Sequence, residues 1–225
     1  MIAAKQDINN CAALKLDVSK SNEILLIINV MKEAIPNFLI QINTRLYENT
    51  LNEDQLTQIY QQQVQILVRK HNYPFNISSQ YRNITYQSQG ISDLYFYPNE
   101  ELELSTSIFS AESKRLPAPD KRREKEHVIG NKNNGGIERY KTEKHGKGLS
   151  ERGLLSFVEE ETFPFWQQRI NTWISGLLIR IPDIWKADEN LAKIESGYYF
   201  IILQSIAHRV SKKDIRLHYL WINIQ

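Results

Sequence analysis

The sequence of 225 residues contains a single cysteine, Cys11, and five histidines that are spread along the chain. One cysteine cannot form a disulfide within the chain, which is typical of a protein from a reducing compartment. The sequence also has no cluster of Cys and His residues that would form a structural zinc site. We find no internal repeat, no phosphate-binding loop rich in glycine and no separate nucleic-acid-binding module. Any chemistry must therefore come from other side chains.

Long hydrophobic runs are also missing. The longest apolar run near the start, residues 23–30, is too short to span a bilayer. The first twenty residues include charged side chains such as Lys5 and Asp7, which is not typical of a signal peptide. We therefore expect a soluble, cytoplasmic protein with no membrane partner. The composition is 41% apolar and 24% charged, which suits a globular domain with a sizeable core.

The first half of the chain predicts two amphipathic helices. One begins at Ser21 or Asn22 and runs to about Tyr47, with Pro36 ending or kinking it. Its apolar stripe serves a core or a dimer interface. We assign residues 1–50 to an N-terminal helical extension and residues 51–225 to the main domain. The second helix runs from Asn52 to about His71 and carries Glu53 in its first turn, where a carboxylate complements the helix dipole.

Two predicted strands near the middle of the chain carry the candidate site residues. We expect strands over residues 92–97 and 107–114, joined by a turn at residues 98–100. Asp93 lies near the start of the first strand. Glu112 and Lys114 lie two residues apart in the second strand, so their side chains share a face, while Ser113 points to the opposite face.

Two carboxylates beside a lysine are suited to metal-assisted hydrolysis. Mg²⁺ prefers carboxylate oxygens and keeps several waters, so Asp93 and Glu112 are candidate ligands. Lys114 would orient the attacking water or neutralise charge on an attacked phosphate. The alternative is that Glu112 and Lys114 form a solvated charge pair on a strand, which is the commoner role of such residues.

The spacing Asp93-x18-Glu112-x-Lys114 in two consecutive strands resembles the PD-(D/E)XK, or restriction-endonuclease-like, nuclease superfamily, with Ser92 in place of the usual proline. The resemblance implies an α/β fold with a mixed central β-sheet flanked by helices. It implies a Mg²⁺-dependent endonuclease acting on DNA, in which Mn²⁺ would substitute for Mg²⁺. By position, Glu53 would be a further metal ligand. Enzymes of this kind commonly act as homodimers, and a partner subunit is the other arrangement we consider.

A basic segment follows the candidate site. Residues 113–148 contain eleven Lys or Arg against five Asp or Glu, a net charge of +6 in a chain whose total is +2. Such a segment is suited to binding a phosphate backbone, although a solvated loop would have the same composition. Its block from Gly135 to Gly146 resembles an uncharacterised group of phage-defence nucleases, in which this block opens a helix beside the active site. Arg115, Arg139 and Lys144 are thereby candidate phosphate contacts.

The C-terminal part predicts further regular elements. We expect a break over residues 73–76, an edge strand at residues 83–86, a strand or helix over residues 149–158, a helix over residues 163–178, a short helix or loop over residues 185–192, and two final strands over residues 198–205 and 215–222. His208 and Arg209, in the turn between the final strands, are candidate DNA contacts. His218 fits a structural role as well as a functional one.

The candidate residues and the resemblance together predict a metal-dependent DNA endonuclease, and the resemblance implies that it acts in restriction or anti-phage defence. Two alternatives remain at this stage. One is a non-catalytic nucleic-acid-binding or assembly subunit of a defence complex, and the other is an RNase or nickase with the same core.

Overall fold

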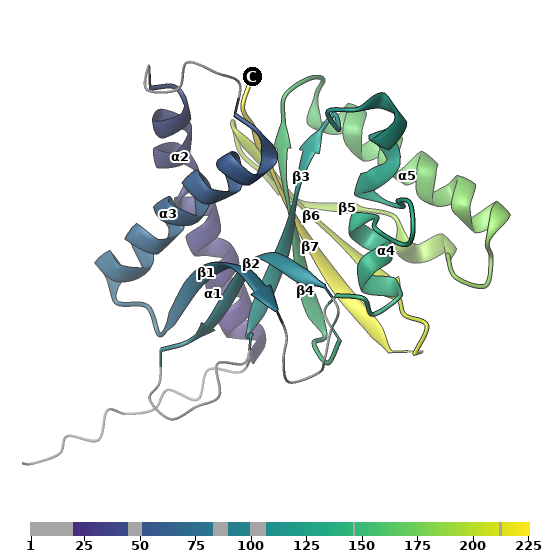
Figure 1. Ribbon diagram of the computed structural model, residues 1–225, viewed down its shortest axis with the longest axis horizontal. Coiled ribbons are helices and arrows are strands. Elements are labelled where there is room, and N and C mark those ends of the chain that lie inside the picture. Colours follow the sequence, from purple (N-terminus) through teal and green to yellow (C-terminus); the bar gives the residue numbers. More distant parts are fainter. Residues whose placement is uncertain (1–19, 45–50, 83–89, 100–106, 146, 212) are drawn as a thin grey trace, which may run out of the picture.

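The computed structural model describes residues 20–44, 51–82, 90–99, 107–145, 147–211 and 213–225, which form a seven-stranded sheet with helices on both faces (Figure 1). β3 pairs in parallel with β4, and β4 with β7, while the other neighbours are antiparallel. The predicted α/β class with a mixed central sheet is confirmed. In spatial order the strands are β1 (Phe75–Arg82), β2 (Ile91–Pro98), β3 (Phe109–Leu116), β4 (Glu151–Val158), β7 (Asp214–Asn223), β6 (Phe200–His208) and β5 (Ala192–Ser196).

Each face of the sheet has its own hydrophobic core. In β4, Leu155 and Phe157 pack with the N-terminal helices, whereas Leu154 and Val158 pack with the helices that follow β3. Because alternate residues of a strand point to opposite faces, one apolar strand serves both cores. The first core is covered by α1 (Lys20–Glu33), α2 (Ile35–Ile42) and α3 (Glu53–His71). The second is covered by α4 (Gly136–Lys141), α5 (Phe163–Arg180) and the 3₁₀ helices η1 (Lys121–His127) and η2 (Ala187–Glu189).

The helix boundaries follow from local chemistry. α2 has Pro36 in its first turn, where the missing N–H group needs no partner, so the long helix predicted near the N-terminus is divided in two. α3 begins as predicted. The side-chain oxygen of Asn52 accepts a hydrogen bond from the backbone N–H of Gln55 at 2.9 Å. The side-chain oxygen of Gln55 in turn accepts one from the backbone N–H of Asn52, also at 2.9 Å. This capping box fixes the position of Glu53, the first residue of the helix.

Two strands differ from the sequence predictions. β1 begins at Phe75, where we expected a break, because Phe75 and Ile77 alternate into the core against β2. The strand that we expected at residues 83–86 lies outside the described residues. β5 was not expected as a strand: all five of its residues are exposed, so it has no hydrophobic alternation to predict it.

No helix in the described part of the chain is long and apolar enough to cross a bilayer.

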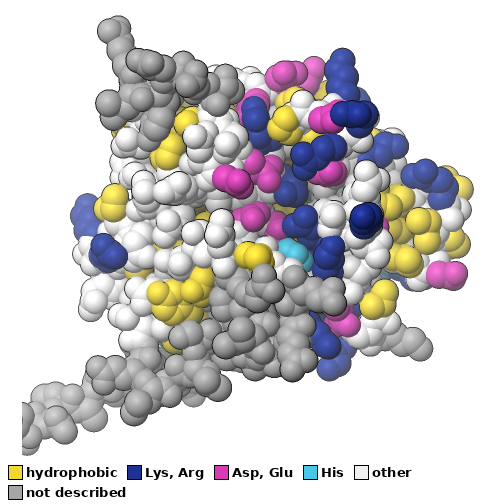
Figure 2. All heavy atoms as spheres, in the orientation of Figure 1, with side chains coloured by type: hydrophobic (Ala, Val, Ile, Leu, Met, Phe, Trp, Pro, Cys, Tyr) yellow, Lys and Arg dark blue, Asp and Glu magenta, His cyan; other side chains and the backbone are white. Residues whose placement is uncertain are grey.

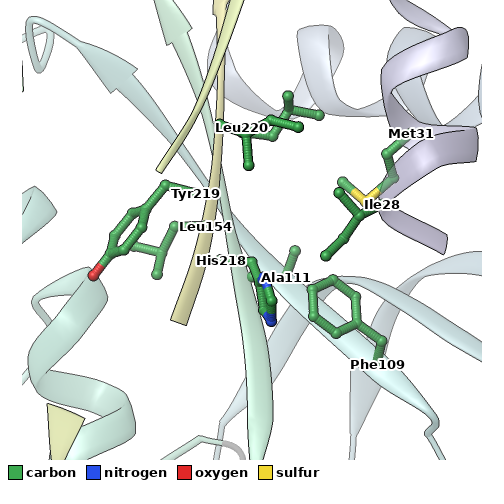
Figure 3. Close-up of a pocket in the computed structure, with 10 residues that line it drawn as sticks. Ile28, Met31, Phe109, Ala111, Leu154, His218, Tyr219 and Leu220 are labelled. Atoms are coloured by element: carbon green, nitrogen blue, oxygen red, sulfur yellow. The ribbon is translucent and has the colours of Figure 1, made fainter. Parts of the chain in front are cut away.

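A small cavity of about 10 Å³ lies inside the first core, between α1 and the sheet (Figure 3). Its lining includes Met31 from α1 and Phe109 from β3. A Cβ atom at Gly153 would lie 2.8 Å from the ring of Phe109, so the glycine lets this ring pack against β4. The cavity is at the lower limit for a water molecule and its exposed lining is apolar, which indicates a packing void and not a ligand site.

Candidate active site

The candidate site is formed where β2 and β3 separate. The two strands pair from Phe96 and Phe109 to Leu94 and Ala111, and the pairing ends there. Beyond this point, β3 has backbone N–H groups that β2 does not reach. Carboxylates take the place of the missing strand. Asp93 Oδ2 accepts the N–H of Ser113 at 2.7 Å, and Glu53 Oε2 accepts the N–H of Arg115 at 3.1 Å. The separation thus gathers two carboxylates along one edge of β3.

Asp93 is the acid whose charge is least compensated. It is partly buried and lies one residue beyond the part of β2 that pairs with β3. Burial and the nearby charge of Glu112 raise its pKa from 3.8 to about 7, against the opposing effects of Lys114 and the N–H of Ser113. Glu53 raises it further by a smaller amount. The influence of Glu112 and Glu53 on Asp93 indicates that the three carboxylates share one electrostatic environment.

Glu112 is completely buried and held from two sides. Its Oε2 accepts a bond of 2.8 Å from Arg139 Nη1, and its Oε1 lies 2.5 Å from His145 Nδ1. Burial by itself would raise the pKa of Glu112, but the hydrogen bond from His145 and the charges of His145, Arg139 and Lys114 outweigh burial and lower it. Glu112 therefore stays ionised in the interior because α4 and the turn after it supply donors.

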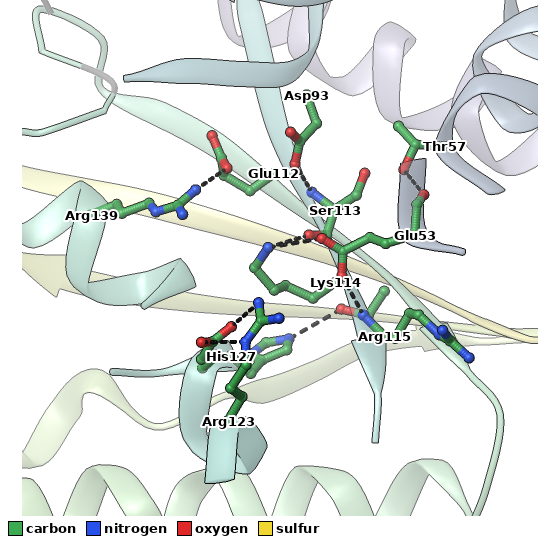
Figure 4. Close-up of polar contacts among 12 residues, drawn as sticks. Glu53, Thr57, Asp93, Glu112, Ser113, Lys114, Arg115, Arg123, His127 and Arg139 are labelled. Carbon is green, nitrogen blue, oxygen red and sulfur yellow. Dashed lines mark hydrogen bonds and ion pairs between the residues drawn. The ribbon is translucent and has the colours of Figure 1, made fainter. Parts of the chain in front are cut away.

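Lys114 points from β3 toward Glu53, as Figure 4 shows. Its ammonium lies 3.1 Å from Glu53 Oε1 and donates a bond of 2.6 Å to the carbonyl oxygen of Ser113. The sequence motif placed Lys114 beside Asp93 and Glu112, and the carboxylate that its ammonium bonds directly is that of Glu53. Glu112 and Lys114 share a face of β3, as predicted, because both lie within one strand and alternate residues of a strand point the same way.

The structure gives Glu53 contacts that its sequence position alone did not predict. Its place in the first turn of α3 accounts for a carboxylate, but its two oxygens also bind the side chain of Lys114 and the backbone of Arg115. The N-terminus of α3 consequently docks onto the exposed edge of β3. We refer to Glu53, Asp93, Glu112 and Lys114 as the acidic cluster.

Sequence reasoning missed His145 and the reason it can reach Glu112. A Cβ atom placed on Gly90 would lie 1.8 Å from both Cδ2 and Nε2 of the His145 ring, so the ring packs directly on the glycine backbone. The N–H of Gly90 also donates to the carbonyl oxygen of Lys144 at 3.2 Å. The only signals in the sequence were a glycine three residues before Asp93 and a histidine beside Lys144. Neither signal indicates that the two residues meet.

His127 is a second buried histidine beside the cluster. Its Nε2 lies 3.1 Å from Ser156 Oγ, and its ring stacks near Tyr219. Burial, followed by the charge of Lys114, lowers its pKa from 6.5 to about 3. His127 is therefore neutral at physiological pH, and it anchors the end of η1 beneath Lys114.

The five candidate DNA contacts are all engaged within the protein. Arg115 forms two bonds of 2.5 Å with Glu159, Arg139 binds Glu112, and Lys144 binds Asn134. His208 bonds Asp188 and Asp214, and Arg209 donates to the carbonyl oxygen of Leu149. Among these five side chains, Arg139 is the one that the described contacts join to the acidic cluster, through its bond to Glu112. His218, for which both roles were open, bonds Glu151 and Gln204.

A divalent cation at this site would need oxygen donors that converge on one point. Among the residues that the structure describes, no group of three His, Cys, Asp or Glu side chains converges closely enough to hold a metal ion. A Mg²⁺ ion needs only one or two carboxylates when waters complete its shell. Asp93 and Glu112 lie one residue beyond the last paired positions of β2 and β3, and the charge of Glu112 helps to raise the pKa of Asp93. These two carboxylates are therefore the candidate pair for such an ion.

Comparisons with protein-family models, with curated proteins and with solved structures give no match for this chain.

Proposed function

We propose that the chain is a metal-dependent endonuclease that hydrolyses DNA phosphodiester bonds. The observation that carries this proposal is the acidic cluster itself: three carboxylates and one ammonium, from α3, β2 and β3, meet where two strands separate. Strongly perturbed carboxylate pKa values cluster at catalytic sites. The choice of DNA and of a restriction or anti-phage setting rests on the resemblance of the sequence motif.

Asp93 and Glu112 are the residues that would hold the metal ion. When bound, Mg²⁺ would polarise the phosphate and lower the pKa of an attacking water. Glu112 can take this role only through oxygens that now accept from Arg139 and His145. Asp93 needs no such change at its second oxygen, because the bond to Ser113 involves Oδ2.

Lys114 supplies positive charge at a fixed position. Its side chain is 12% exposed, and Glu53 and the carbonyl oxygen of Ser113 hold its ammonium in place. A preorganised cation stabilises charge that develops on an attacked phosphate without reorganisation of solvent. Glu53 therefore acts as a positioning residue for Lys114.

The proposal is tested by incubating the purified protein with supercoiled plasmid, single-stranded DNA and RNA, each in Mg²⁺, Mn²⁺ or EDTA. We expect cleavage of DNA with either ion and none in EDTA. Lys114→Ala should reduce the rate about 10²–10³-fold, as does the loss of one transition-state donor in other enzymes. Lys70→Ala, at the exposed end of α3, is the control and should cut at the wild-type rate. Cleavage by Lys114→Ala at the control rate would contradict the assignment, and cleavage of RNA alone would change the substrate to RNA.

One observation favours a second function. Both oxygens of Glu112 are occupied by Arg139 and His145, which is the arrangement expected if the glutamate has a structural role. The protein would then be a non-catalytic nucleic-acid-binding subunit that keeps the fold of a nuclease. Salt-dependent binding of DNA without cleavage in any metal would support this function.

A further inference from the structure

A basic groove lies along η1, the 3₁₀ helix that follows β3 in the chain. Its volume is about 280 Å³, and its lining includes four cations and one carboxylate, Arg122, Arg123, Lys125, Arg180 and Glu126, together with the uncharged residues Ile129, Gly130 and Asn131. The first three cations belong to η1, and Arg180 is the last residue of α5. Two elements that are far apart in sequence thus bring positive charge to one hollow.

The charge in this groove is only partly compensated. Arg122 pairs with Asp120 at 2.8 Å, and Arg123 pairs with Glu126 at 2.6 Å. Among the ion pairs of the described residues, none involves Lys125 or Arg180. Both side chains are exposed, and the hydrogen bond of Arg180 goes to a neutral group, the carbonyl oxygen of Gly176 at 3.4 Å. The groove therefore holds two cations whose charge can meet an anion from solution.

The helix η1, which lines the groove, lies near the candidate active site: the charge of Glu53 acts on Arg123, and that of Lys114 acts on His127. β3 ends at Leu116 and η1 begins at Lys121, so a short connection places η1 next to Lys114. Figure 4 shows Arg123 and His127 of η1 lying close to Lys114 and Arg115. In Figure 2, Lys and Arg side chains form a band beside a group of acidic side chains on the same face. An anionic polymer bound at the acidic cluster would therefore meet further positive charge along η1.

We infer that this groove is a phosphate subsite, which binds the backbone of the nucleic-acid strand on one side of the scissile bond. Arginine forks match phosphate oxygens in pairs, and the hollow allows several cations to reach one anion. The inference rests on the proposed function, because it takes the acidic cluster as the point of cleavage. It also replaces Arg139 and Lys144 as the main backbone contacts, since their side chains are bound to Glu112 and Asn134.

The length of η1 gives the reach of the subsite. Its seven residues span roughly 14 Å at about 2 Å per residue. One strand of duplex DNA advances about 3.4 Å per nucleotide. A strand that runs along the whole of η1 would therefore pass about four nucleotides over this helix.

The test is a binding measurement that needs no catalysis. Binding of a fluorescein-labelled 20-base-pair DNA duplex is followed by anisotropy in EDTA over a range of salt concentrations. The variant combines Lys125→Gln with Arg180→Gln, and the control combines Lys70→Gln with Lys193→Gln. The control removes the same charge from exposed positions on α3 and β5. Matching thermal melting curves would show that both proteins are folded.

We expect the groove variant to bind about tenfold more weakly, and its log–log salt slope to fall by about 1.8, or about 0.9 for each phosphate that the variant no longer neutralises. Equal reductions in the variant and the control would overturn the subsite. Equally tight binding of poly-L-glutamate, with the same dependence on Lys125 and Arg180, would overturn its assignment to phosphate.

The result is separate from that of the cleavage assay. A lower slope in a protein that cuts nothing would keep the groove and reject the nuclease. Metal-dependent cleavage with an unchanged slope would keep the nuclease and reject the groove.

Discussion

Replacing Asp93 with Asn should stabilise the folded protein while it removes the proposed metal ligand. The raised pKa means that ionised Asp93 is less favourable in the folded state than in the unfolded chain. A rise from 3.8 to about 7 corresponds to roughly 4 kcal/mol at 1.36 kcal/mol per unit. Because Asp93 is partly exposed, solvent screens some of this energy, and we expect about 2 kcal/mol. Asn keeps an oxygen that can accept the N–H of Ser113.

The dependence on pH follows from the sign of the shift. As the pH rises from about 4 to about 7, the unfolded chain loses the Asp93 proton while the folded state keeps it, so the wild-type protein becomes less stable relative to the variant. Urea denaturation in EDTA at several pH values measures this difference. Asp93→Asn should be more stable than wild type by about 2 kcal/mol at pH 8 and nearly equal to it at pH 4.

Glu112→Gln supplies a contrast of opposite sign. The pKa of Glu112 is lowered, so its ionised form stabilises the fold at neutral pH, and that stabilisation is lost as the pH falls through the folded-state pKa. The Gln variant should therefore be less stable than wild type at pH 8. If Asp93→Asn were no more stable than wild type at pH 8, or if its gain did not depend on pH, the crowding of carboxylates at this site would be refuted.

Two further variants test contacts around the sheet. Gly90→Ala should lower the free energy of unfolding by at least about 2 kcal/mol, because the added Cβ displaces His145 and leaves the buried Glu112 with one donor fewer. The control is Gly176→Ala, which should not destabilise the protein because no atom lies within 4 Å of its added Cβ. Equal urea midpoints for the two variants would contradict this account. His208→Gln should destabilise at pH 6 and have little effect at pH 9. Burial lowers the pKa of His208, but the bonds to Asp214 and Asp188 outweigh burial and raise it. The ion pairs of His208 therefore stabilise the folded protein fully below pH 6.5, and this stabilisation is lost as the pH rises through the raised pKa. A destabilisation by His208→Gln that does not depend on pH would show that the ion pairs contribute nothing.

Local chemistry in the sequence was sufficient to predict much of the fold. α3 followed from the cap at Asn52 and its apolar stripe, and β3 followed from a short run in which Glu112 and Lys114 alternate with Ser113. These features depend on residues that are near one another in the chain, so periodicity and capping encode them. The α/β class followed from the motif resemblance and from the sum of such elements.

The remaining features depend on residues that are distant in sequence. Arg115 was a candidate for binding DNA, but Glu159, 44 residues later, binds its guanidinium. His145 reaches Glu112 only because Gly90 leaves room for its ring. Sequence spacing carries no record of such contacts, since they arise when the sheet brings separate segments together. The exposed strand β5 was missed for a different reason, the absence of any hydrophobic alternation.

A crystal structure of the protein with Mn²⁺, measured for anomalous scattering, tests the central claim most directly. We predict a peak bound by carboxylate oxygens of Asp93 and Glu112 at about 2.1 Å, with at least one of the bonds from Arg139 and His145 to Glu112 broken. Absence of a peak at this position, with Glu112 still held by both donors, would show that the acidic cluster is a structural ion network and not a metal site.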